Sequence, residues 1–118
     1  MEKRRFAYIM LGGFLGASVR EIFSIMFPNA QGVLLANVLA SFILGYFMYA
    51  TGLGFFSDRE RFVVGIGFCG GLSTFSTFML QTMQFPIHEA ILNVTTNIVF
   101  CLFAVFLGRI AAVEGLGL

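Results

Sequence analysis

Three long intervals of the chain carry no charged side chain, and this feature constrains the fold more than any other. The intervals are residues 22–57, 62–88 and 90–108. Each approaches or exceeds the roughly 20 residues that a helix needs to cross the hydrocarbon core of a bilayer. A shorter interval, residues 6–19, reaches this length if Arg20 and Glu21 lie at the membrane interface. The pattern predicts four membrane-spanning helices.

The predicted helices lie near residues 6–26, 33–55, 62–83 and 89–112. Together they take up most of the 118 residues, so we expect one all-α, four-helix membrane domain covering residues 1–118. Only 11% of the residues are charged, whereas a soluble domain carries about 25%. The predicted location is the cell membrane, with several crossings and membrane lipid as the surrounding solvent.

Composition also argues against catalysis and nucleic-acid binding. The net charge is only +1, which provides no basic field for phosphates. His88 is the only histidine, and no carboxylate lies inside an apolar interval to act with it. Cys69 and Cys101 lie in separate predicted helices and form no CxxC pair, so a zinc site is not expected. We therefore do not expect an enzyme.

The third predicted helix contains a sequence that is unfavourable for continuous helix. Gly70 and Gly71 precede four hydroxyl residues within positions 73–77. Glycine is entropically costly in a helix, and hydroxyl side chains compete for its backbone hydrogen bonds. We predict a break near residues 70–74, where freed carbonyls line a cavity or bind a cation. Close helix packing by small residues is the competing interpretation.

Polar residues recur in the second and fourth predicted helices. Asn37 lies in the second predicted helix. There its amide either hydrogen-bonds to a neighbouring helix or faces a water-filled pathway. Asn93, Asn97 and Cys101 are spaced four residues apart and Thr96 is three from Asn93, so they form one stripe. Neutral donors of this kind suit an ion that must shed its water without being trapped. Helix association explains the stripe equally well.

Two phenylalanines follow the predicted break. Phe75 and Phe78 are three residues apart and share one helix face. The positive edge of a phenylalanine ring can face an anion. Because the chain holds 16 phenylalanines, chance proximity is the simpler explanation for this pair alone.

Four segments together resemble the Fluc, or CrcB-type, family of fluoride channels. The segment 70–78 (Gly-Gly-Leu-Ser-Thr-Phe-Ser-Thr-Phe) is similar to the family signature in its broken third helix. Residues 12–20, 36–42 and 104–108 are similar to its first, second and fourth helices. Departures occur at Gln81, a position that is often Glu in the family, and at Asn93, which is often Tyr.

The resemblance implies a channel that exports cytoplasmic fluoride passively through two pores of an antiparallel dimer. It implies that a fluoride pathway includes Asn37, Phe75, Phe78, Thr77, Asn93, Thr96, Asn97 and Arg20, with Asn37 coordinating fluoride or orienting the rings. It also implies a structural Na⁺ at the centre of the dimer interface. The ligands implied for this ion are the backbone carbonyls of Gly70 and Ser73, two from each subunit.

The distribution of basic residues bears on the identity of the partner subunit. Four crossings place residues 3–5, 59–61 and 109 on one side of the membrane. Six of the seven Lys and Arg residues therefore lie on that side, and only Arg20 lies on the other. The positive-inside rule then predicts cytoplasmic termini. A chain that inserts in both orientations should show a weaker bias. A homodimer and a pair of oppositely oriented homologous subunits both remain open.

Two other classes of protein share this size and helix number. One is a small dual-topology multidrug exporter, which depends on a carboxylate within its first helix, whereas residues 6–19 contain none. The other is a membrane assembly subunit that transports nothing. Small residues and a polar stripe would suffice for that role.

Overall fold

The computed structural model describes residues 2–27 and 30–115, and its regular structure is helical throughout this part of the chain. The elements in chain order are α1 (Glu2–Met26), α2 (Ala30–Gly52), α3 (Asp58–Glu60), the π-helix η1 (Arg61–Phe68), α4 (Cys69–Leu72), α5 (Ser76–Gln84) and α6 (Ile87–Gly115). Four stretches are long and apolar enough to cross a membrane: Lys3–Met26, Ala30–Gly52, Arg61–Gln84 and Ile87–Gly115. The chain is a multi-pass, all-α membrane protein, as the charge pattern predicts.

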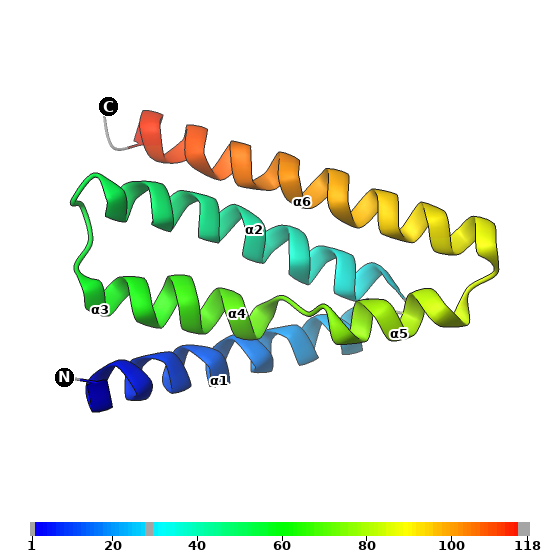
Figure 1. The fold of residues 1–118 in the computed structure, drawn as a ribbon, viewed down its shortest axis with the longest axis horizontal. Coiled ribbons are helices and arrows are strands. Elements are labelled where there is room, and N and C mark those ends of the chain that lie inside the picture. The colour runs from blue at the N-terminus through cyan, green and yellow to red at the C-terminus, as the bar shows by residue number, and fades with distance from the viewer. Residues whose placement is uncertain (1, 28–29, 116–118) are drawn as a thin grey trace.

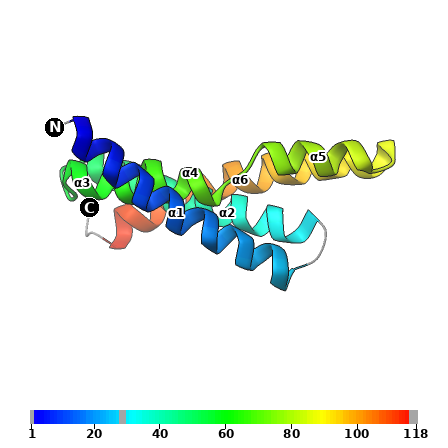
Figure 2. The same cartoon turned by 90° about the horizontal axis from the view of Figure 1, so that it is seen from below.

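The four spans associate mainly as two pairs. Figure 1 shows α1 beside the third span, which is made of η1, α4 and α5, and α2 beside α6. Both ends of the chain and the α2–α3 connection lie at the same end of the molecule. Figure 2 shows that α5 and the start of α6 diverge from the end of α1 and the start of α2. The ribbons of the two pairs of helix ends are therefore separated at the opposite end of the bundle.

Glycines bring α1 and the third span into backbone contact. A methyl group added at Gly12 would overlap the carbonyl oxygen of Val63 and lie 2.8 Å from the Phe68 nitrogen. Methyl groups at Gly16 and Gly71 would likewise overlap backbone atoms of the facing helix. Helices in lipid associate through such close packing, because there is little hydrophobic force to bring them together. We call these contacts the glycine seam.

The pair formed by α2 and α6 packs in the same way. A methyl group at Gly45 would overlap the Val105 carbonyl, and one at Gly108 would overlap the Phe42 carbonyl. The second helix ends at Gly52, three residues before the expected end near residue 55. Beyond it, Gly54 has a φ of 86°, a backbone conformation that glycine adopts without steric cost.

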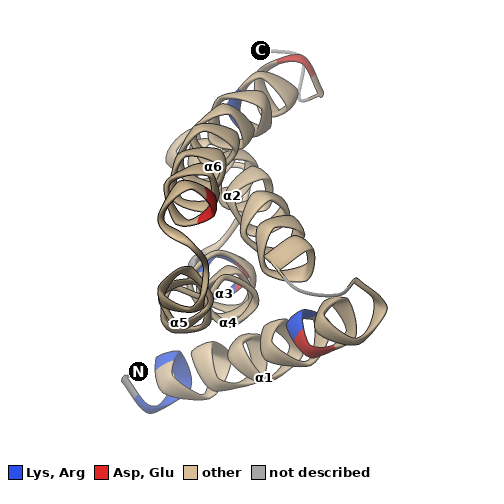
Figure 3. Ribbon diagram, turned by 90° about the vertical axis from the view of Figure 1, so that its right-hand side faces the viewer, with Lys and Arg blue, Asp and Glu red and all other residues tan. Residues whose placement is uncertain are grey.

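Basic residues gather at the end that holds both termini. The start of α1, α3, the first residue of η1 and the last two turns of α6 lie there, and they carry six of the seven Lys and Arg residues. The guanidinium groups of Arg5 and Arg61 lie 5.4 and 5.0 Å from the centre of the Phe62 ring, and Arg109 lies 5.0 Å from that of Tyr49. In Figure 3, which views the opposite end, charged residues on the near helix ends are few.

Candidate functional site

The third span is interrupted at residues 73–75, between α4 and α5. Ser73 has an extended backbone, with φ −75° and ψ 154°, although its N–H still donates to the Cys69 carbonyl at 3.0 Å. The Thr74 N–H leaves the helical pattern and donates to the Asn37 side-chain oxygen at 2.8 Å. In a continuous helix that N–H would bond the Gly70 carbonyl. The Gly70 carbonyl therefore loses its helical donor.

One of the two glycines before the interruption packs closely against α1, as the competing interpretation of this segment predicts. Gly70 and Gly71 were expected to weaken the helix, yet both lie within α4. Gly71 faces the backbone of α1, whereas no atom lies within 4 Å of a methyl group added at Gly70. Gly71 is therefore required for close packing, and the helix ends only at the first of the hydroxyl residues.

Asn37 on α2 satisfies both backbone groups of Thr74. Its Oδ1 accepts from the Thr74 N–H, and its Nδ2 donates to the Thr74 carbonyl at 3.2 Å and to Asn97 Oδ1 at 3.3 Å. Unpaired backbone groups are expensive in a membrane, so this pairing stabilises the interruption. Both N–H donors of the Asn37 amide are engaged within the protein.

The hydrogen bonds continue from Asn37 across two more helices. Asn97 on α6 donates from Nδ2 to the carbonyl and side-chain oxygens of Asn93, at 2.9 and 3.2 Å. Asn93 donates to the Thr82 hydroxyl on α5 at 2.9 Å. We call these four side chains, Asn37, Asn97, Asn93 and Thr82, the amide chain. It joins α2, α6 and α5 around the interruption.

A groove of about 300 Å³ lies where the amide chain meets the interruption. Its lining residues are Asn37, Ser41, Ser73, Thr74, Phe75, Phe78, Asn97, Ile98 and Cys101. We call it the phenylalanine groove, and no residue that lines it is charged. The rings of Phe75 and Phe78 are 5.9 Å apart and inclined at 49°. Phe78 is only 7% exposed whereas Phe75 is 72% exposed, so one ring is packed and the other projects from this chain.

A second recess, of about 540 Å³, opens at the end away from the termini. It is lined by Ala30, Gln31, Leu34, Phe85, Glu89, Leu92, Asn93 and Thr96. We call it the end recess. Asn93 and Thr96 lie here, whereas Asn97 and Cys101 lie in the phenylalanine groove. The polar stripe on α6 therefore serves two cavities, and Asn93 links them through its bonds to Asn97.

Two of the expected pathway residues line neither cavity. Arg20 lies near the end of α1, with its Nε buried and without a hydrogen-bond partner. Thr77 contributes its backbone N–H, which donates to the Thr74 hydroxyl at 3.3 Å and so helps to start α5. Sequence reasoning missed Ser41 in the phenylalanine groove. Its spacing of four residues from Asn37 could have indicated it.

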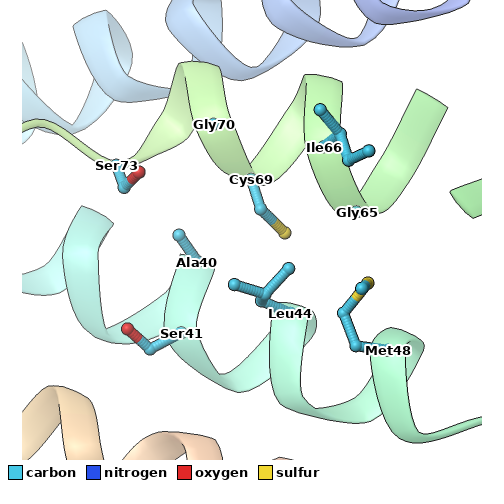
Figure 4. A pocket seen from close by; sticks show the side chains of 9 residues that line it. All are labelled: Ala40, Ser41, Leu44, Met48, Gly65, Ile66, Cys69, Gly70 and Ser73. Atoms are coloured by element: carbon cyan, nitrogen blue, oxygen red, sulfur yellow. The ribbon is translucent and has the colours of Figure 1, made fainter. Parts of the chain in front are cut away.

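A third groove, of about 330 Å³, lies between α2 and the segment from η1 to the interruption (Figure 4). It is lined by Ala40, Ser41, Leu44, Met48, Gly65, Ile66, Cys69, Gly70 and Ser73. Both expected sodium ligands, Gly70 and Ser73, line this groove. The described residues form no cluster of three His, Cys, Asp or Glu side chains suited to a metal. A cation bound here would depend on neutral oxygen atoms.

Comparison with known proteins gives one consistent result. The model of the family described as "CrcB-like protein, Camphor Resistance (CrcB)" matches residues 7–109. A Pyrococcus horikoshii protein named fluoride-specific ion channel FluC is 43% identical, covering 95% of this chain and 98% of its own length. Proteins of the same name from Methanococcus maripaludis and Pyrococcus furiosus are 38% and 42% identical and cover 92% and 95% of this chain.

Proposed function

The chain belongs to the CrcB-like family, and from this premise we propose that it conducts fluoride passively across the cell membrane through two pores of an antiparallel dimer. The observation that carries the proposal is the phenylalanine groove. There the interruption of the third span, two aromatic rings and the amide chain meet without a charged residue.

The lining of this groove suits a small, strongly hydrated anion. The hydroxyl groups of Ser41, Ser73 and Thr74 are neutral hydrogen-bond donors, and phenylalanine ring edges carry partial positive charge. Several such groups replace water together, while none holds the ion as a fixed cation would. Because both Asn37 donors are occupied, we assign Asn37 to positioning the interruption rather than to direct fluoride coordination.

The exposure of Phe75 supports the need for a partner subunit. An aromatic ring that is 72% exposed beside a nearly buried one forms only part of a wall around an ion. A second chain, identical or homologous, would complete this wall in the antiparallel arrangement. The same partner would cover the groove that contains Gly70 and Ser73.

A sodium ion is part of the proposal. Sodium prefers hard oxygen ligands, and the Gly70 carbonyl has lost its helical donor because the Thr74 N–H bonds Asn37. The Gly70 and Ser73 carbonyls of two chains would supply four such ligands. If this site stabilises the dimer, replacing Na⁺ by a bulky organic cation should shift the equilibrium toward monomer.

Efflux from liposomes tests the channel function. Vesicles that contain the protein are loaded with fluoride or with chloride, and ion loss is followed with an electrode. Rapid loss of fluoride alone is expected. No loss of either ion would favour an assembly subunit, and proton-coupled cation uptake would favour an exporter.

A variant links the flux to the groove. Phe78→Ile should suppress fluoride efflux while the dimer persists, because it removes the packed ring without adding a polar group. Phe106→Ile is the matched control, since this α6 ring is 59% exposed and lines none of the cavities described above. Undiminished flux in Phe78→Ile would refute the assignment.

A further inference from the structure

Glu89 is the only charged residue among those that line the two grooves and the end recess. It lies in the first turn of α6 and its side chain is exposed. A carboxylate at the mouth of a cavity that adjoins an anion pathway calls for an explanation, because it repels the ion that has to approach.

The end recess and the phenylalanine groove lie along one face of α6. Glu89 is four residues before Asn93, and Asn93 is four before Asn97, so the three side chains follow successive turns. The first two line the end recess and the third lines the phenylalanine groove. Hydrogen bonds between Asn93 and Asn97 connect the two cavities. An ion that enters through the recess therefore passes Glu89 before it reaches the amide chain.

No positive charge of the recess offsets this carboxylate. Its other lining residues are neutral, and within the described part of the chain the structure gives Glu89 no ion pair. Arg20 and Glu21 on α1 line neither the grooves nor the end recess, and the neighbouring His88 is exposed. Glu89 is thus the one charge that the lining of the end recess presents to an entering ion.

We propose that Glu89 is an electrostatic barrier that limits the rate at which fluoride enters through the end recess. This inference rests on the proposed channel function. A fixed negative charge lowers the local concentration of anions within about one Debye length, roughly 10 Å at 0.1 M salt, and added salt screens the effect. The residue thereby sets the throughput of the pathway and its dependence on ionic strength.

The competing explanation is purely structural. An acidic residue in the first turn of a helix interacts favourably with the helix dipole, and Glu89 has that position in α6. A structural role would lower the stability of a Gln variant without changing ion entry. The two explanations therefore differ in flux and in its response to salt.

The test is fluoride efflux from liposomes at constant fluoride gradient, with ionic strength varied by an impermeant salt. Glu89→Gln should raise the initial rate about twofold to fivefold at roughly 10 mM ionic strength, and the difference should disappear near 0.5 M. Glu89→Asp keeps the charge and should behave as wild type. Glu114→Gln removes the same charge from the exposed far end of α6 and should have no effect.

The wild-type protein provides a second measurement that needs no variant. Its own efflux rate should rise as salt screens the carboxylate. A rate that does not respond to ionic strength, or a Glu89→Gln rate equal to wild type at low salt, would overturn the barrier even if Gln lowered the thermal stability. If vesicles that contain the wild-type protein release no fluoride, the channel function itself is refuted. Failure of the barrier and failure of the channel function are therefore distinguishable.

Discussion

The third span is held in two different ways on either side of its interruption. Before the interruption, the glycine seam brings the backbone of η1 and α4 against that of α1, with no room for a methyl group at Gly12, Gly16 or Gly71. After it, α5 is attached to α6 through the amide chain, in which Asn93 reaches the Thr82 hydroxyl. One half is fixed by contact between backbones and the other by hydrogen bonds between side chains.

The difference separates scaffold from pathway within a single helix. Close backbone contact leaves no space, so the glycine seam excludes water and ions along its length. Side-chain hydrogen bonds hold helices farther apart, and the two cavities that contain amide-chain residues lie on this side of the span. Polar contacts are therefore found where an ion is proposed to pass, and glycines where the bundle has to be rigid.

The largest effect is expected from filling the glycine seam. Gly12→Ala should prevent the folded bundle from forming, because its methyl group would overlap the Val63 carbonyl in a backbone that has no room to move. Gly13→Ala is the matched control on the same helix. Its methyl group would lie 3.9 Å from the Gly67 oxygen, an ordinary contact. Helix propensity alone favours Ala at both positions by about 1 kcal/mol.

The measurement for this pair is the yield of monodisperse protein in detergent and its thermal unfolding midpoint. Gly13→Ala should match or exceed wild type, and Gly12→Ala should give little folded protein. Equal behaviour of the two variants would show that the seam is looser than the glycine positions indicate.

The next largest effect is expected at the start of the amide chain. Asn37→Ala leaves the N–H and carbonyl of Thr74 unpaired in an apolar region, which costs about 1–3 kcal/mol for each group. Fluoride efflux should fall about tenfold or more because the interruption loses its defined geometry, with 1.4 kcal/mol corresponding to a factor of ten. Val38→Ala shortens a neighbouring side chain on α2 as the control. The measurement is fluoride efflux from liposomes at equal protein content, which should fall for Asn37→Ala and stay near the wild-type rate for Val38→Ala.

The outcome for Asn37 also decides how the two halves are coupled. If Asn37→Ala unfolds the glycine seam as well, the two halves form one cooperative unit. If only the efflux falls while the unfolding midpoint changes by a few degrees, the amide chain acts locally. Efflux as fast as wild type would remove Asn37 from the proposed pathway.

Sequence patterns predicted the four spans because charge avoidance is a local and strong signal in lipid. The predicted break near residues 70–74 overlaps the interruption only at its hydroxyl residues, because Gly70 and Gly71 lie within α4. Whether Gly71 disrupts a helix or packs it depends on the facing helix, and that information is absent from the local sequence. Only the contact with α1, more than 50 residues away in the chain, distinguishes the two roles.

The candidate site was predictable only in part for the same reason. The spacing of Asn93 and Asn97 predicted a shared face, and their mutual hydrogen bonds show that they do share it. The pairing of Asn37 with Thr74 spans 37 residues and depends on how two helices cross. Arg20 matched the family pattern by position, yet it lines neither cavity of this single chain.

A smaller effect is expected at the far end of the amide chain. Thr82→Val keeps the shape of the side chain but removes the acceptor for Asn93. The loss should lower the free energy of unfolding by about 1 kcal/mol and slow efflux only modestly, since the interruption itself is untouched. Thr95→Val is the control, because Thr95 is exposed on α6. A tenfold fall in efflux would place the critical contact at α5 rather than at the interruption.

The smallest effect on stability is expected for a side-chain hydrogen bond that is exposed to water. At the start of the third span the Ser57 N–H donates to Glu60 Oε2 at 2.7 Å, which is the glutamate half of a capping box, and the Ser57 hydroxyl donates to the same oxygen. These bonds lower the pKa of Glu60 below its ordinary value. Water can replace them, so their loss should cost less than the loss of the Asn93–Thr82 bond in the membrane.

The sign of the pH dependence follows from the lowered pKa. The ionised form is favoured in the folded state, so the stabilisation is complete above the ordinary glutamate value of about 4.3 and is lost as the pH falls toward the lower folded value. The difference in unfolding midpoint between wild type and Glu60→Gln should therefore be present at neutral pH and shrink on acidification. Glu114→Gln should show no such trend, because Glu114 is exposed and its side chain has no hydrogen bond within the described residues. A wild-type advantage that persists unchanged at acidic pH would mean that Glu60 contributes through packing, and the contrast between exposed and membrane-embedded hydrogen bonds would then rest on Thr82 and Asn37 alone.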